Sequence, residues 1–182
     1  DDRDSNVYNV IQIGKFCWMA ENLAYLPSVS PSNAGSWQSR DYYVYGYEGT
    51  DINIAKSTNN YQTYGVLYDW NAATNGDISS GTVPSGIQGV CPEGWHLPSD
   101  EEWKILEGEV DNLYNYPDMI WDSLGWRGTD AGGNLKQTGT THWYNINTGA
   151  TNSSGFTALP AGYRSDASGF FGINTQANFW TA

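Results

Sequence analysis

The sequence offers few groups that could perform catalysis. Asp100, Glu101 and Glu102 carry consecutive carboxylates, and His96 and His142 carry imidazoles; both are groups used for general acid or base chemistry. Consecutive residues of a helix point in different directions, so the three carboxylates cannot converge on one substrate. His96 stands between apolar residues and is expected to be structural, whereas His142, in a polar segment, is the better functional candidate. We therefore assign no catalytic residue.

The cysteines and histidines do not form a metal motif. Cys17 and Cys91 lack CxxC spacing and stand apart from both histidines in the sequence, so a zinc site is not expected. Their spacing is compatible with a disulfide in an exported protein and equally with two buried thiols. Calcium stays open as a cofactor, because the later segments are rich in the oxygen donors that it prefers. These donors are Asp130, Asn134, Asn145, Asn147, Asn152 and Asp166.

Aromatic side chains among small polar residues give a stronger signal, and it favours binding. The chain has 9 Trp, 13 Tyr and 21 Gly, and only 15% of its residues are charged. Rigid rings beside Asn, Ser, Thr and Gly combine apolar faces with adaptable hydrogen-bonding groups, which suits a glycan or a protein surface. We expect about two-thirds of these rings, Phe170 and Phe171 included, to be core, with Trp143, Tyr144 and Arg164 exposed. The candidate ligand-binding residues are Trp126, Arg127, Trp143, Tyr144, Tyr163, Arg164 and Trp180.

The charge balance limits the classes of partner. With 20 acidic and 8 basic residues the net charge is −12, which repels nucleic acid and anionic membranes. No run of about 18 apolar residues occurs, so membrane insertion is not expected. This composition suits a soluble protein outside the cell.

Two helix starts can be recognised from their caps. Ser99 followed by Glu102 makes a capping box, which predicts a helix that begins after Ser99 and ends near Pro117. The same box assigns Glu102 to helix capping rather than to catalysis. Asp69 predicts the cap of a shorter helix that reaches Ala73. Trp95 and Trp103, which flank the capping box, are assigned to the core.

Strand signals are short and are separated by long polar segments. Apolar residues over 7–13 and 16–19, on either side of Gly14-Lys15, predict a β-hairpin. The segment 27–60 is predicted to be an irregular surface excursion, and 125–155 to be long loops pinned by buried rings. Further strand candidates are Phe156–Pro160, Phe170–Ile173 and Asn178–Ala182.

Four motifs occur in one order along the chain. They are Trp18–Leu23, Tyr64–Ala73, Cys91–Ser99 and Gly155–Arg164. Together they resemble the Fibrobacter succinogenes major paralogous domain, a family of exported proteins common in Bacteroidetes-type bacteria, over about residues 6–182. The segment 97–103 is also similar to the helix start of formylglycine-generating enzymes. This similarity implies the C-type-lectin-like fold.

The resemblance implies a single α+β domain over residues 1–182, exported to the extracellular space or the cell surface. It has two helices, a small twisted antiparallel sheet and a long loop region that carries binding. Family members continue past Asn178-Phe179-Trp180, so we expect the closing C-terminal strands to be missing and the domain to be incomplete at the C-terminus. The open sheet edge would receive that missing segment or another subunit. Formylglycine-generating enzymes use late cysteines, and none follows Cys91 here, so their oxidase activity is not expected.

Three functions follow from these expectations. The first is a non-catalytic recognition domain that binds a glycan or a surface protein through its aromatic loop face. The second is a structural module, of adhesin or pilus type, in which surface rings and an open sheet edge dock a neighbouring subunit. The third is a hydrolase acting on surface polysaccharide through carboxylates that are here assigned to caps and loops.

Overall fold

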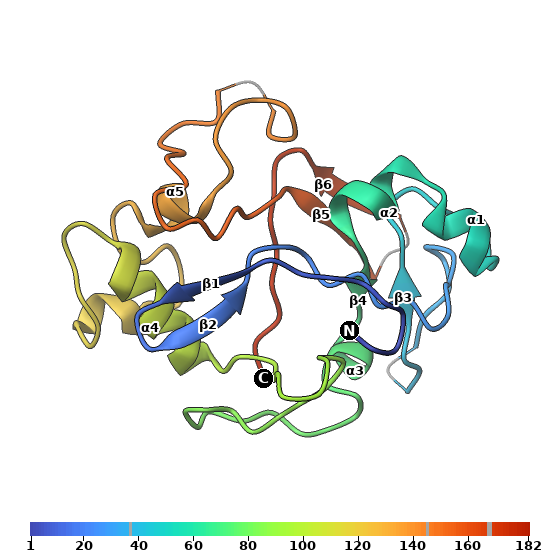
Figure 1. Ribbon diagram of the computed structural model, residues 1–182, viewed down its shortest axis with the longest axis horizontal. Coiled ribbons are helices and arrows are strands. Elements are labelled where there is room, and N and C mark those ends of the chain that lie inside the picture. The colour runs from blue at the N-terminus through green and yellow to red at the C-terminus, as the bar shows by residue number, and fades with distance from the viewer. Residues whose placement is uncertain (37, 145, 167–168) are drawn as a thin grey trace.

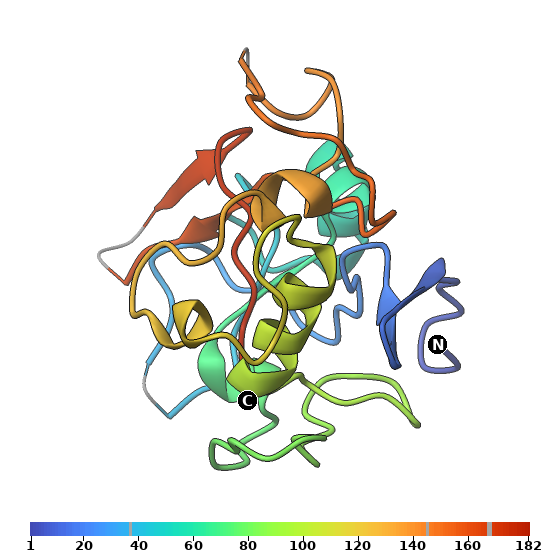
Figure 2. The same ribbon diagram turned by 90° about the vertical axis from the view of Figure 1, so that its left-hand side faces the viewer.

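The computed structural model describes residues 1–36, 38–144, 146–166 and 169–182 as a mixed α and β domain with short elements and long connections (Figures 1 and 2). Among these residues the strands pair as three two-stranded antiparallel sheets, β1–β2, β3–β4 and β5–β6. The strands are β1 (Val10–Ile13), β2 (Phe16–Met19), β3 (Tyr42–Tyr43), β4 (Leu67–Tyr68), β5 (Ala161–Arg164) and β6 (Phe170–Ile173). The α-helices are α1 (Ile52–Lys56), α2 (Asn59–Tyr64), α3 (Trp70–Ala73), α4 (Asp100–Val110) and α5 (Ala131–Leu135), with a 3-10 turn over Met119–Asp122.

The predicted N-terminal hairpin is confirmed. Ile13 pairs with Phe16, so Gly14 and Lys15 alone form the turn, and Gly14 has the positive φ of 59° that tight hairpin turns require. Period-two alternation places Ile13 and Trp18 in the core and leaves Cys17 exposed. Cys17 and Cys91 are both free thiols.

Helix α4 begins where the capping box predicts. The Ser99 hydroxyl accepts the Glu102 N–H at 3.2 Å, and the Glu102 carboxylate accepts the Ser99 N–H at 3.0 Å. The helix ends at Val110, however, so its predicted extension toward Pro117 is wrong. Asp111 is extended (φ −76°, ψ 137°), and its carboxylate accepts backbone N–H groups two and three residues ahead. These local bonds satisfy the backbone outside the helix and so end it. The short helix after Asp69 is confirmed as α3.

The segment 27–60 is more regular than its composition suggests. It contains β3, α1 and the start of α2, which corrects the prediction of an irregular surface excursion. Asp51 caps α1 by accepting the N–H groups of Asn53 and Ile54, and Thr58 caps α2. The segment also contributes Val44 to the core. Short capped helices escaped the prediction because they are too short to show an apolar period.

The strand candidates after residue 150 are confirmed only in part. Phe170–Ile173 is β6, but its partner is β5, immediately after the predicted segment 156–160. That predicted segment forms a single bridge, between Lys136 and Ala158. The last candidate, 178–182, has no assigned secondary structure and belongs to no described sheet. Among the described residues of 125–155, the regular structure consists of α5 and the bridge at Lys136.

The core is divided into separate apolar clusters. One lies between the β1–β2 hairpin, α4 and α5, and a second packs against α1, α2 and β4. The first contains Ile13, Trp18, Leu106, Leu135, Phe156 and Ala158. The second contains Leu26, Val29, Val44, Ala55 and Val66. Within the described chain, no helix has the length and apolar character needed to span a membrane.

Candidate functional site

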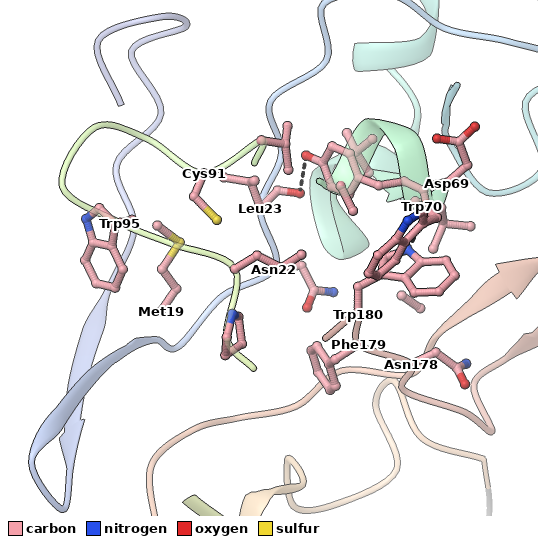
Figure 3. A pocket seen from close by; sticks show the side chains of 18 of the residues that line it. Met19, Asn22, Leu23, Asp69, Trp70, Cys91, Trp95, Asn178, Phe179 and Trp180 are labelled. Carbon is pink, nitrogen blue, oxygen red and sulfur yellow. Dashed lines mark hydrogen bonds between the residues drawn. The ribbon is translucent and has the colours of Figure 1, made fainter. Parts of the chain in front are cut away.

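An open groove of about 1210 Å³ is lined by residues from many parts of the chain. Figure 3 shows Met19 and Trp95 on one side of it and Trp70 and Trp180 on the other. Its walls come mostly from the segments 15–23, 64–73, 90–103, 156–166 and 178–180. Segments far apart in the sequence therefore converge on one site.

A series of rings lines the groove. Trp103 lies 5.1 Å from Trp18 and 5.3 Å from Phe179, measured between ring centroids. Trp180 meets Trp70 edge to face at 5.7 Å, and its Nε1 donates to the carbonyl of Tyr68 at 2.7 Å. These contacts fix the ring orientations, so the rings form a rigid apolar surface before any ligand arrives.

The polar side chains of the groove are largely engaged inside the fold. Asn22 donates to the carbonyl of Tyr64 at 3.0 Å. The carboxylate of Asp69 caps α3 by accepting the Ala72 N–H at 2.7 Å and also accepts the Asp41 N–H at 3.1 Å. Burial raises the pKa of Asp69, while these two N–H donors counteract the rise. Asn22 and Asp69 thus stabilise the walls.

Glu102 is buried in the groove lining and has two partners, Ser85 and His96, besides its role in the helix cap. Only 1% of the residue is exposed, and its carboxylate accepts the N–H groups of Ser85 and Ser99. His96 Nε2 lies 2.7 Å from the other oxygen. The expected structural, hydrogen-bonded His96 is confirmed. His142 bonds Gln137 through Nδ1 at 2.7 Å and does not line the groove.

Three of the seven predicted ligand-binding residues line the groove, namely Tyr163, Arg164 and Trp180. Tyr163 and Trp180 are 39% and 45% exposed. Arg164 is half-buried, because Nε donates to the carbonyl of Ser32 at 2.9 Å and Nη2 to that of Ala34 at 2.7 Å. The expectation of an exposed Arg164 is therefore wrong. The two hydrogen bonds that its guanidinium donates hold the segment 32–34 in place.

The other four predicted residues lie elsewhere. Trp126 and Tyr144 are exposed, at 102% and 72%, but neither lines the groove. Arg127 forms ion pairs with Glu107 at 2.5 Å and Asp100 at 3.1 Å in a smaller hollow beside α4. Trp143 is only 7% exposed and donates to a backbone carbonyl, so the expectation of an exposed Trp143 is wrong. Its ring instead pins a loop, under the ammonium of Lys136.

The expected burial of most late rings is also wrong. Among the rings considered, Trp143 alone is buried, whereas Phe171 is 49% exposed and Phe170 is half-buried. Trp95 and Trp103, assigned to the core, are half-buried and line the groove, and Trp103 also packs against the first core cluster as expected. Sequence reasoning also missed several lining residues: Trp18, Met19, Trp70, Cys91, Asn178 and Phe179. Adjacent rings in an extended segment, as at 179–180, are the one local signal that could have indicated two-sided lining.

The calcium candidates are engaged in loop structure. Asn134 Oδ1 accepts the Thr151 hydroxyl at 2.6 Å, and Asn152 Oδ1 accepts the Thr157 N–H at 2.9 Å. Asn145 lies outside the described residues. Over the ranges that the structure describes, no group of three or more His, Cys, Asp or Glu side chains is arranged to hold a metal ion.

The sequence was compared with known families, curated proteins and solved structures. Residues 11–182 match the Fibrobacter succinogenes major domain. The chain belongs to this family. All groove-lining residues fall inside the matched range of the major domain. No curated protein and no solved structure matches the chain.

Proposed function

We propose that this major domain is an exported, non-catalytic recognition domain that binds a glycan or a surface protein in the aromatic groove. The observation that carries the proposal is the convergence of Trp70, Trp103, Phe179 and Trp180 on one wide hollow. Rigid aromatic rings offer large contact areas at a low cost in conformational entropy, and they dominate the energetics of many binding sites. Of the seven predicted ligand-binding residues, the proposal keeps the three that line the groove, namely Tyr163, Arg164 and Trp180.

We also propose that the mixed α and β architecture is C-type-lectin-like. Two features support this proposal: the C-terminal segment, at Ala177, packs against the same apolar cluster as the N-terminal hairpin, and long irregular connections surround the small sheets (Figure 1). The long connections carry much of the groove lining, as a binding loop region would.

The carboxylates beside the groove support a non-catalytic role. Glu102 is enclosed and already accepts hydrogen bonds from Ser85, Ser99 and His96. Asp69 is a helix cap. A polysaccharide hydrolase needs one carboxyl group that can protonate the leaving group and a second one across the scissile bond. Using Glu102 in this way would require the helix cap to break.

Truncating a groove tryptophan tests the proposal. Trp180→Ala or Trp70→Ala should weaken ligand binding by about tenfold or more, because buried aromatic anchors carry a large share of binding energy. Trp126→Ala is the matched control, since its ring is fully exposed outside the groove and its loss should leave binding within about twofold. The measurement is a glycan array with purified domain, followed by titration of each hit and by titration with isolated cell-surface proteins. Equal binding by all variants would contradict the groove as the site.

A structural assembly module is the second candidate, and one observation favours it. Strand β2 of the hairpin lines the groove. Its edge facing away from β1 pairs with no other strand of the described chain. Exposed strand edges are templates for pairing with another chain. A strict monomer in sedimentation at high concentration, with no partner bound, would contradict this candidate.

A further inference from the structure

We infer that the ligand of the groove is an extended polypeptide strand of a partner protein, which adds to the outer edge of β2. The inference rests on the proposed function, in which the groove binds a ligand, and it names the chemistry of that ligand. Three independent features of the groove lead to it: the backbone of β2, the apolar wall and the charge.

The backbone of β2 presents hydrogen-bonding groups to the groove. The Ala20 N–H donates to the carbonyl of Asn9 at 2.9 Å, so this cross-strand pair is a hydrogen-bonded one. Bonded and non-bonded pairs alternate in an antiparallel ladder, so Cys17 and Met19 direct their N–H and C=O groups away from β1. Both residues line the groove, and these groups have no backbone partner among the described residues. A two-stranded hairpin with such an edge accepts a third strand.

The apolar wall fits the side chains of such a strand. Side chains of neighbouring strands share faces, so alternate residues of an added strand would lie on the face that carries Phe16 and Trp18. On that face Trp18 contacts Trp103, which in turn contacts Phe179. The added strand would therefore bury apolar side chains at every second position. This pattern is that of a strand with one solvated face.

The polar groups favour a polypeptide over a glycan. A sugar needs several unengaged donors and acceptors around its hydroxyl groups, but Asn22, Asp69 and Glu102 are hydrogen-bonded within the fold. The groove does offer main-chain N–H and C=O groups without a backbone partner among the described residues, at Cys17 and Met19 along β2. Their spacing matches another strand.

Charge favours a basic partner rather than a second copy of this chain. The groove lining includes the acidic residues Glu21, Asp69, Glu102 and Asp166 and only two basic ones, Lys15 and Arg164, of which Arg164 is committed to two carbonyl groups. Each copy carries a net charge of −12, so two copies repel each other at this face. A strand with lysine or arginine at its ends is attracted to it.

A synthetic peptide is the probe. It alternates valine and threonine with lysine at each end, and binding to the whole chain is followed by calorimetry and by amide hydrogen exchange. We expect exchange at the Cys17 and Met19 amides to slow by about tenfold or more, while the Trp18 amide, already bonded to β1, changes little. The same peptide with alternate backbone nitrogens methylated should bind about tenfold more weakly, since it loses its hydrogen bonds along one edge.

Two matched proline variants test whether the peptide binds at the outer edge of β2. Met19→Pro removes the N–H that faces the groove and should reduce peptide affinity by about tenfold. Val10 pairs with Met19 across the hairpin, but it lies on β1, at the edge opposite to the proposed site. Val10→Pro should therefore leave the affinity for the peptide within about twofold. Thermal melting of both variants checks folding. If Met19→Pro unfolds, the methylated peptide still decides the question with the wild-type chain.

Four outcomes would overturn the inference. They are no peptide binding, equal binding of plain and methylated peptides, protection away from β2, and a self-associated chain whose interface excludes the peptide. If Trp180→Ala abolishes glycan binding while no peptide binds, the proposed recognition function stands and the strand inference fails. If Trp180→Ala changes neither glycan nor peptide binding, the proposed function itself fails.

Discussion

At the scale of single residues, short polar side chains decide where helices begin and end. Ser99, Asp51 and Asp69 each accept N–H groups of the helix that follows, which satisfies donors that have no partner inside the helix. Glu102 completes the cap of α4 and also bonds His96 and Ser85, so one carboxylate ties three segments together.

Replacing Ser99 tests the cap. Ser99→Ala should lower the free energy of unfolding by about 0.5–2 kcal/mol, because the Glu102 N–H loses its acceptor in a fully buried position. The control Ser99→Thr keeps a capping hydroxyl. Urea denaturation monitored by circular dichroism gives both values. A change near zero in the alanine variant would mean that the cap contributes no stability.

At the scale of elements, Asp111 joins the end of α4 to the segment that precedes α5. Its carboxylate accepts the N–H groups of Thr129 at 2.6 Å and Asp130 at 3.0 Å, in addition to those just after α4. Burial alone would raise the pKa of Asp111, but these N–H donors outweigh burial and hold the pKa well below its ordinary value. The charged form is therefore the one that the folded state stabilises.

The sign of the pH dependence follows from that lowered pKa. The stability from Asp111 is present above the unfolded pKa of about 4 and is lost as the pH falls through the lower folded pKa. Asp111→Asn should reduce the free energy of unfolding at pH 7 by about 2 kcal/mol or more and flatten its decline below about pH 4. Urea denaturation across this pH range measures both effects, with the exposed Asp2→Asn as control. An unchanged acid limb in Asp111→Asn would contradict the assignment.

At the scale of the whole molecule, a few contacts of long sequence separation hold the groove walls in place. Arg164 in β5 bonds the carbonyls of Ser32 and Ala34, 132 and 130 residues away, and its guanidinium lies 5.0 Å from the ring centroid of Tyr43. Trp180 bonds the carbonyl of Tyr68, 112 residues away. Such contacts require the complete fold.

Replacing Arg164 tests this long-range attachment. Arg164→Lys keeps the charge but loses the planar fork that reaches two carbonyls, so the segment 32–36 should become more open. We expect its amides to exchange hydrogen about tenfold faster, with helix α4 unaffected. Arg40→Lys is the control, because Arg40 is exposed and bonds the side chain of Asn75. Unchanged exchange at 32–36 would show that Arg164 does not hold this segment.

The candidate site was predictable in part, for reasons visible in particular residues. Tyr163, Arg164 and Trp180 were identified because rings and a cation stand among small polar residues. Trp143 belongs to the same pattern but is buried, since composition does not reveal whether a ring faces inward or outward. The sequence did not predict that Met19 and Trp70 line a groove, because Met19 lies in a segment with an ordinary strand pattern and Trp70 at an ordinary helix start.

The sequence by itself determined the caps of α3 and α4, the N-terminal hairpin and the family, because each depends on residues within a few positions of one another or on ordered motifs. The tertiary structure alone decided which rings are exposed, where α4 ends and that a groove exists. The groove and the exposure of its rings depend on segments 15–23, 64–73, 90–103 and 178–180 meeting in space. Their meeting depends on contacts between residues far apart in the chain, which no local pattern encodes.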